Sequence, residues 1–579
     1  MLPPEIQETI HKLFIIMWAT RLTPVNWKTS STILIDKGKG EETNLSSYRP
    51  IGIANTLYKL WTRLITTTLY EYAEAHSLLS NTQAGFRNQK DTIHQLQNVI
   101  MSLEDAKFFK QDIYALIVDF TSAFNTTDHD RMLWIMYDLG FPTDAIDTVK
   151  NLYEDATTLI RLANGTNTGQ IAVERGTIQG DTLSPFLFLL YMEPLLRWLH
   201  VGGRGYKHIC IPNQNQTVSE THLANILSSA SFADDLLSKT NTIQNLKIQA
   251  RKVTLYSDWA ALIISGSKTK VTGILYGHSP RDKNGVTPSQ TLCQQLRDKI
   301  DIQGQKAQFI TPDTPFRYLG VELTMNLNWK HQIQCMTSNL KEKLENLRTT
   351  SLTPSLILKI IRTAIIPSLT YSFAVTPCTP TDLEMWDNMV DRIIKDKFGL
   401  WTCTATAMIR EDTSNCGLGV SSISVEYHRR MALALTLSLE DPSNRHRNVT
   451  LSLLTMQVKH LKDLATEYLT TREGTNHRIK RQLDYCMRAR QLISVYSSKL
   501  HLTKQNISLF LDDFKIIDEA LSLHKPPAHS FPTLIACITK PLLSLDIQGL
   551  HDLTTNSGTH IISVAQLKNK HSKITKKGK

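Results

Sequence analysis

Three aspartates beside short apolar runs constrain this chain more than any other feature of its sequence. Asp119 ends the run Tyr114–Val118, and Asp234 and Asp235 lie within the apolar segment Ser231–Leu237. Short apolar runs that end abruptly in polar residues are typical of buried strands. The pattern therefore predicts one strand that ends in a carboxylate and two strands joined by a turn that carries two more.

Carboxylates in such surroundings lose water when the chain folds, which is costly unless they are paired or neutralised. Oxygen ligands on short side chains suit Mg²⁺, with Mn²⁺ as a substitute. Two such ions can hold the attacking and leaving oxygens of a phosphoryl transfer. The alternative is an Asp-Asp turn on the surface and an unrelated N-cap aspartate, and each residue taken singly favours it.

Eight short blocks follow one another in a fixed order along the chain. They are Tyr48-Arg-Pro-Ile51, Asn55-Thr-Leu-Tyr-Lys-Leu60, Gln83-Ala-Gly-Phe-Arg87, Val118-Asp-Phe-Thr-Ser-Ala-Phe124, Gln179-Gly-Asp-Thr-Leu-Ser-Pro185, Phe232-Ala-Asp-Asp235, Ser267-Lys-Thr-Lys270 and Tyr318-Leu-Gly-Val321. Each block alone is a weak signal, but their common order and spacing are specific. Over roughly residues 20–425 the series resembles the reverse transcriptases of non-LTR (LINE-like) retrotransposons.

The resemblance implies a role for each matching position. Asp119, Asp234 and Asp235 match the catalytic aspartates, which would hold two Mg²⁺ ions. The positions that match nucleotide-binding residues are Arg49, Phe124, Gln179 and Lys268. The positions that match template- or primer-binding residues are Gln83, Gly85, Arg87, Gly180, Tyr318, Leu319 and Gly320. An ordinary core phenylalanine and a solvated turn lysine are equally good interpretations of Phe124 and Lys268.

The fold that the resemblance implies is α+β, a right-hand polymerase whose palm carries the three aspartates on an antiparallel sheet. We expect an N-terminal helical extension at 1–27, fingers and palm at 28–330, and a helical thumb at 331–425. Helical periodicity dominates after about residue 330, and a mainly helical C-terminal region is expected at 426–567. Residues 568–579 form a Lys-rich tail, interpreted either as a solvated terminus or as a nucleic-acid contact or nuclear address.

The function implied is an RNA-directed DNA polymerase of a non-LTR retrotransposon. It would extend a primer 3′-hydroxyl with deoxynucleoside triphosphates on an RNA template, using a DNA primer or nicked target DNA. No endonuclease pattern accompanies the blocks, so we expect the nick to come from a separate endonuclease.

Two other functions compete with this one. Asn125 stands where the family usually has Asp, which favours a decayed or domesticated copy that only binds RNA or an RNA–DNA hybrid. A maturase-like protein of a group II intron is a third option, against which the segment from Tyr48 to Leu60 argues.

Composition indicates the cellular location and the kind of partner, but it does not decide between these functions. The formal net charge is +11, which suits a polyanionic partner but does not require one. The eight cysteines form no Cys-x-x-Cys pair, which argues against a zinc knuckle and favours reduced thiols inside a cell. We therefore expect an intracellular, nuclear location and no membrane partner.

Overall fold

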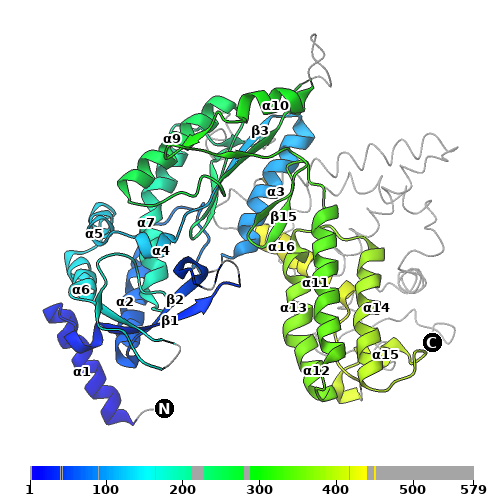
Figure 1. Cartoon of the computed structure of the whole chain (residues 1–579), viewed down its shortest axis with the longest axis horizontal. Helices are drawn as coiled ribbons and strands as arrows, with labels where there is room; N and C mark the ends of the chain where they lie inside the picture. Colours follow the sequence, from blue (N-terminus) through cyan, green and yellow to red (C-terminus); the bar gives the residue numbers. More distant parts are fainter. Residues whose placement is uncertain are drawn as a thin grey trace, which may run out of the picture. The chain divides into compact units, whose positions relative to one another are not determined.

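The computed structural model consists of two compact units, residues 1–328 and 329–579. The described residues are 3–38, 41, 43–88, 90–162, 165–209, 226–278, 287–415, 417–439 and 449–450 (Figure 1). The units separate between Asn328 and Trp329, close to the start expected for the thumb. The tail at 568–579 and most of the expected region at 426–567 lie outside the described residues.

The core of the first unit is a five-stranded sheet with the order β13-β10-β3-β9-β8. Its strands are β3 (Ile113–Val118), β8 (Ser229–Phe232), β9 (Asp235–Thr240), β10 (Lys270–Ile274) and β13 (Gln308–Phe309). Neighbours run antiparallel except β10 and β13. The strands predicted beside the three aspartates are confirmed, and all of them belong to this sheet.

Three long helices pack against this sheet or against one another: α3 (Thr92–Phe109), α7 (Leu183–His200) and α9 (Ile243–Trp259). Helix α7 is apolar on every side because it is buried on almost every side. Helix α3 begins at Asp91, whose side chain accepts a hydrogen bond from the backbone N–H of His94 at 2.9 Å. That contact is a typical N-cap, which satisfies one free N–H of the first turn.

A second sheet lies in the N-terminal part of this unit and has the order β2-β1-β4-β5. Its strands are β1 (Thr29–Asp36), β2 (Tyr48–Ile53), β4 (Thr157–Ile160) and β5 (Ile171–Ala172). The helices of this region are α1 (Pro4–Thr20), α2 (Thr56–Ala75), α4 (Ala123–Thr126), α5 (His129–Asp138) and α6 (Thr143–Tyr153). One continuous hydrophobic cluster joins them to the central sheet.

Short elements complete the first unit. They are η1 (Val25–Trp27), η2 (Leu45–Ser47), β6 (Tyr206–Lys207), β7 (Ile226–Leu227), α10 (Pro288–Leu296), β11 (Asp301–Ile302), β12 (Gln305–Lys306), β14 (Phe316–Tyr318) and β15 (Val321–Leu323). The hairpin of β14 and β15 contains the last of the eight blocks.

The described part of the second unit is helical. Its elements are α11 (Lys330–Thr349), α12 (Pro354–Ile360), η3 (Ile361–Ile365), α13 (Ile366–Thr370), η4 (Tyr371–Ala374), α14 (Pro380–Lys397), α15 (Thr406–Arg410), η5 (Thr413–Asn415) and α16 (Ile423–Leu439). They share a separate hydrophobic core around Trp386. Among the described residues, Pro354–Ala374 is the one helical stretch long and apolar enough to cross a membrane, and 44% of its apolar window is buried within the protein.

Candidate active site

Two of the three aspartates lie opposite each other at one end of the central sheet. Strands β3 and β9 pair antiparallel, with Val118 opposite Leu236. Asp119 follows Val118 and Asp235 precedes Leu236, so the same register brings these two residues together. Two positions that are far apart in the sequence are therefore neighbours because of strand pairing alone.

The third aspartate lies in the tight turn that joins β8 to β9. Phe232 pairs with Asp235, so Ala233 and Asp234 are the two central residues of the turn. Ala233 has a φ of +54°, a left-handed conformation that costs a residue with a Cβ roughly 1–2 kcal/mol. Strain of this kind persists only where the surroundings hold it, and it concentrates at functional sites.

The three carboxyl groups repel one another. Burial is the largest cause that raises the pKa of each of them. The charge of Asp119 raises the pKa of Asp234 further, and the charges of Asp234 and Asp119 help to raise that of Asp235 to about 6. Asp235 keeps an exposed surface, so it loses water mainly on the side that faces the protein. The cluster carries more negative charge than nearby side chains neutralise.

Carboxylate oxygens on adjacent backbone segments are the donor set that a hard divalent cation prefers. The unneutralised charge of Asp119, Asp234 and Asp235 fits such an ion. Within the described part of the chain, no three His, Cys, Asp or Glu side chains come close enough together to hold a metal ion as they stand. Three like charges without a cation between them are expected to stay apart.

A turn between Ser265 and Lys270 lies against the end of β3. The backbone N–H of Ser265 donates to the carbonyl oxygen of Asp119 at 2.9 Å, and the N–H of Asp119 donates to Oγ1 of Thr269 at 3.3 Å. Lys268 is exposed on this turn, and its charge lowers the pKa of Asp119 against the larger effect of burial. The turn therefore places the expected lysine within electrostatic reach of the first aspartate.

Phe124 lies half-buried on α4, with its ring fixed by another ring. It stacks on Phe188 of α7, with the ring centroids 4.2 Å apart and the planes inclined by 22°. Phe124 also packs against the main hydrophobic cluster. Both interpretations of this residue are therefore compatible with its placement: it belongs to the edge of the core, and part of its ring remains accessible.

Gln179 reaches the residue that follows Phe124. Its Nε2 donates to Oδ1 of Asn125 at 3.1 Å, in an exposed contact. The backbones of the same two segments are also hydrogen-bonded, since the N–H of Thr177 donates to the carbonyl oxygen of Phe124 at 2.9 Å. Sequence reasoning treated Asn125 as a departure from the family without a role. The structure gives Asn125 a role, because its side chain binds the amide of Gln179.

Gly180 allows a close approach between two segments of the chain itself. Its φ is +117°, and a Cβ at this position would lie 2.6 Å from the carbonyl oxygen of Gly52 on β2. The N–H of Gly52 in turn donates to the carbonyl oxygen of Gln179 at 2.6 Å. The tight fit observed here is between β2 and the turn before α7. Gly180 is exposed, and its contact with template and primer stays a prediction.

The same strand β2 carries Arg49. This arginine is exposed, and within the described ranges its guanidinium has no hydrogen-bond or ion-pair partner. The strand is anchored to the turn of Gln179 through Gly52. The structure therefore places two of the expected nucleotide-binding side chains on segments that are hydrogen-bonded to each other.

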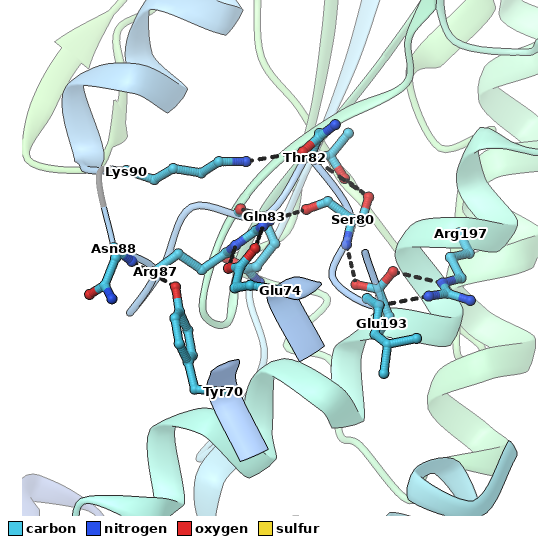
Figure 2. A network of polar contacts seen from close by, with 12 residues as sticks. Tyr70, Glu74, Ser80, Thr82, Gln83, Arg87, Asn88, Lys90, Glu193 and Arg197 are labelled. Carbon is cyan, nitrogen blue, oxygen red and sulfur yellow. Dashed lines mark hydrogen bonds and ion pairs between the residues drawn. The ribbon is translucent and has the colours of Figure 1, made fainter. Parts of the chain in front are cut away.

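The block Gln83–Arg87 differs from expectation, because all of it except Phe86 is buried. Gln83 has no exposed surface and Arg87 is 8% exposed. Arg87 pairs with Glu74 of α2 at 2.8 Å and donates to the carbonyl oxygen of Ser80 at 2.7 Å. These side chains face the protein (Figure 2), so the expectation that they lie along the template is corrected.

Gly85 is buried for a steric reason. A Cβ on Gly85 would lie 2.4 Å from the backbone nitrogen of Ala233. The loop before α3 thus touches the turn that carries Asp234, and any side chain at position 85 would push the two apart.

A buried carboxylate ties the same loop to helix α7. Oε2 of Glu193 accepts a hydrogen bond from the backbone N–H of Ser80 at 2.8 Å, and Oε1 accepts one from Nε of Arg197 at 2.8 Å (Figure 2). Burial raises the pKa of Glu193, although both of these contacts oppose the shift. No sequence motif marks Glu193, because it lies in the apolar run that forms α7.

The hairpin of β14 and β15 reaches the central sheet through Tyr318. Tyr318 is buried, and its hydroxyl donates to the carbonyl oxygen of Ala230 on β8 at 3.0 Å. Leu319 and Gly320 form the turn, both with positive φ. The expected primer contact is therefore corrected for Tyr318, which anchors the hairpin, whereas Leu319 and Gly320 remain at an accessible tip.

Sequence reasoning missed one exposed aromatic residue at the site. Phe86 is 52% exposed and has a φ of +54°. Its ring centroid lies 6.4 Å from that of Phe124 and 6.4 Å from that of Phe232. An exposed ring in a left-handed conformation is unusual, and the positive φ could not be read from the sequence.

The geometry agrees with the chain's similarity to known proteins. Residues 35–323 match the family model described as "Reverse transcriptase (RNA-dependent DNA polymerase)". The match includes all eight blocks. It leaves out the first residues of the chain and the helical second unit. Reverse transcriptases use divalent metal ions, which fits the donor set of the three aspartates.

Relatives extend this likeness over a longer stretch. The chain is 24% identical over 403 residues to a "Retrovirus-related Pol polyprotein from type-1 retrotransposable element R2" of Popillia japonica, covering 69% of this chain and 52% of that protein. It is 23% identical to the corresponding R2DM polyprotein of Drosophila melanogaster, covering 71% and 35%. It is 22% identical to the "RNA-directed DNA polymerase from mobile element jockey" of Drosophila funebris, covering 60% and 35%.

The chain spans about half of these relatives' length, or less. Among solved structures, apo telomerase from Candida tropicalis aligns over 78% of this chain and 74% of its own, at 12% identity and a TM-score of 0.33. The family match, the antiparallel sheet that carries the aspartates, and the retrotransposon relatives agree: this chain carries a reverse transcriptase domain over residues 35–323 that is similar to those of the R2 and jockey retrotransposons.

Proposed function

We propose that this chain is an RNA-directed DNA polymerase that extends a primer 3′-hydroxyl with deoxynucleoside triphosphates on an RNA template. The observation that carries the proposal is the pairing of β3 with β9, which brings Asp119 opposite Asp235 next to the turn of Asp234. A site of this kind, in a domain that matches the reverse transcriptases over 35–323, favours polymerisation over binding alone.

We further propose that Asp119, Asp234 and Asp235 hold two Mg²⁺ ions, with Mn²⁺ as a substitute. The support is the excess negative charge of the three carboxyl groups, each with a raised pKa. When bound, the ions would supply positive charge to the reacting oxygens of primer and triphosphate. The protein's part is to hold the three carboxylates at one end of the central sheet, and the bound ions would favour their ionised form.

The neighbouring side chains fit a nucleotide that enters beside these carboxylates. Arg49 is exposed and without a partner within the described ranges, so it could meet a triphosphate, for which a planar guanidinium is well suited. Gln179 is held by Asn125, so its amide is already oriented. Phe124 is stiffened by its stack on Phe188, and a fixed ring excludes a 2′-hydroxyl better than a mobile one. Lys268, near Asp119, would donate a proton to the leaving pyrophosphate.

The primer end would rest on the accessible tip formed by Leu319 and Gly320, since Tyr318 anchors that hairpin to β8. With nicked chromosomal DNA as the primer, the chain would act in the nucleus. This part of the proposal is supported by the retrotransposon relatives and by the basic net charge.

Primer extension on an RNA template tests the proposal directly. Purified protein, Mg²⁺ and the four deoxynucleotides should yield extended primer, and Asp234→Ala should reduce the rate by a factor of about 10³ or more, since it removes a metal ligand. Asp301→Ala, at an exposed aspartate that pairs with Lys306 and has no role in the proposed site, is the matched control and should keep the parent rate.

Two results would contradict the proposal. Full synthesis by Asp234→Ala would remove the metal site from the mechanism. No synthesis by a folded protein that still binds an RNA–DNA hybrid would favour the domesticated copy.

A further inference from the structure

Gln83 makes an unusual set of contacts for a side chain with no exposed surface. Its Oε1 accepts hydrogen bonds from the backbone N–H of Gly85 and of Ala233, both at 2.9 Å. Its Nε2 donates to Oγ of Ser231 at 3.1 Å and to the carbonyl oxygen of Ala233 at 3.3 Å. Three of these four contacts are to residues of the β8–β9 hairpin.

These partners also fix which end of the amide is oxygen. Two backbone N–H groups face Oε1, and two oxygens face Nε2. The opposite orientation would place the NH₂ group against two N–H donors, which the buried site does not tolerate. The amide of Gln83 therefore binds Ala233 as a neighbouring strand would, through both its N–H and its C=O.

The residue that Gln83 binds is the strained one. Ala233 has a positive φ and directly precedes Asp234. Binding its N–H and its C=O fixes the peptide planes on both sides of its Cα, and the second plane leads into Asp234. A strained backbone persists where its surroundings over-determine it, and Gln83 supplies that constraint from a different part of the chain.

Gln83 is itself held rigidly. The residues around it form a short parallel bridge with the edge of β8: the N–H of Ser231 donates to the carbonyl oxygen of Thr82 at 2.9 Å, and the N–H of Ala84 donates to that of Ser231 at 3.0 Å. Arg87 closes the loop from the other side, since Nη1 donates to the carbonyl oxygens of Ser80 and Gln83 (Figure 2).

We infer that Gln83 is a positioning residue of the polymerase site, which sets the Ala233–Asp234 turn so that the carboxylates of Asp234 and Asp235 share one region with Asp119. This inference rests on the proposed function. Gln83 touches neither substrate nor metal, because it is buried behind the turn. Its effect is on where the carboxylates stand, and therefore on how well they hold a divalent ion.

The test compares Gln83→Met with Gln95→Met. Methionine fills nearly the same volume as glutamine but makes no amide hydrogen bonds. Gln95 is a matched control because it is also buried, and its Nε2 donates to the carbonyl oxygen of Thr82 rather than to the turn. Both variants lose buried hydrogen bonds, so both should melt at lower temperatures than the parent.

The two variants should differ at the active site. We expect Gln83→Met to lower kcat by about 10- to 100-fold, since a small misplacement of reacting groups has effects of this size. The Mg²⁺ concentration for half-maximal rate should rise several-fold, with little change in KM for the deoxynucleotide. Gln95→Met should keep the parent's metal dependence at any temperature where it is folded.

Hydrogen exchange provides a readout that needs no activity. The amides of Ala233 to Leu236 should exchange faster in Gln83→Met than in the parent, and should be unchanged in Gln95→Met. If the parent protein makes no DNA, the proposed function fails, yet this comparison still decides whether Gln83 holds the turn. Should Gln83→Met not fold, Gln83→Asn replaces it, since its amide is one methylene too short to span Ala233.

Parent-like exchange in the turn together with parent-like metal dependence in a folded Gln83 variant would overturn the inference. An equal shift of the metal dependence in Gln95→Met would overturn it as well, because the effect would then follow from general loosening of the loop.

Discussion

At the scale of single residues, the cluster of Asp119, Asp234 and Asp235 destabilises the metal-free fold when its carboxyl groups are ionised. The folded-state pKa of Asp235 is raised from its ordinary 3.8 to about 6. An acid whose pKa is higher in the folded state binds a proton more tightly there, so folding is favoured below about pH 4. That advantage is lost as the pH rises through 4 to 6, where the carboxyl ionises against its neighbours.

Replacing Asp235 by Asn should therefore stabilise the metal-free protein at pH 7. The full pKa shift would overstate the gain because Asp235 keeps contact with water, and we expect about 1 kcal/mol, or roughly 2 °C in Tm. Melting curves in a chelator at pH 7 and pH 4 measure it. The gain in Tm should vanish at pH 4, where Asp235 is protonated in the parent. The Asp235→Asn variant should also lose DNA synthesis. A Tm below that of the parent at pH 7 would show that the three carboxylates do not repel one another.

The same scale shows what the sequence can and cannot reveal. The strand before Asp119 and the turn at Asp234 were predictable because both are local patterns of apolar and acidic residues. The contact of Gln83 with Ala233 joins residues 150 positions apart, and nothing local marks a glutamine as buried. The pairing of Asn125 with Gln179 is equally long-range, so only the folded chain shows why the two positions belong together.

At the scale of elements, the loop from Ser77 to Asp91 determines how the central sheet ends. It leaves α2, contacts the edge of β8 and enters α3, and its polar contacts with Glu74 and Glu193 replace the regular hydrogen bonds that a loop lacks. The family blocks predicted that this segment matters, but they suggested an exposed surface. A loop can be buried in this way only if other groups satisfy its backbone, and Arg87 does this for the carbonyl oxygens of Ser80 and Gln83.

Removing the guanidinium should destabilise this loop more than an exposed ion pair would. Arg87 is almost fully buried and Glu74 about one-third exposed. Burial alone would raise the pKa of Glu74, and the hydrogen bonds and charge of Arg87 bring it below the usual value. Arg87→Met should lower the free energy of unfolding by about 2–3 kcal/mol, near the lower end for a broken buried pair.

Denaturant unfolding measures this loss, with Lys306→Met as the control. Lys306 pairs with Asp301 on an exposed surface, and such pairs contribute at most about 1 kcal/mol. Equal effects of the two substitutions would mean that the loop is not held by Arg87. Adding Glu74→Gln to Arg87→Met should cost little more, since the second partner has already lost its contact.

At the scale of the whole molecule, the two units have separate hydrophobic cores. The cluster of the first unit draws its buried members from Met17 to Ala307, and that of the second from Met336 to Ile423. No residue belongs to both clusters in the described part of the chain. All the residues assigned to the proposed site, from Arg49 to Gly320, lie in the first unit.

A fragment of residues 1–328 should therefore fold by itself and keep the properties of the carboxylate cluster. A unit that buries its own core should unfold in one cooperative transition, and thermal melting followed by circular dichroism checks this. The stabilisation by Asp235→Asn in a chelator at pH 7 should persist in the fragment, because the repelling carboxylates are all present. A fragment without a cooperative transition would show that the first unit depends on the second for its stability. A folded fragment that is not stabilised by Asp235→Asn would place the source of the repulsion outside residues 1–328.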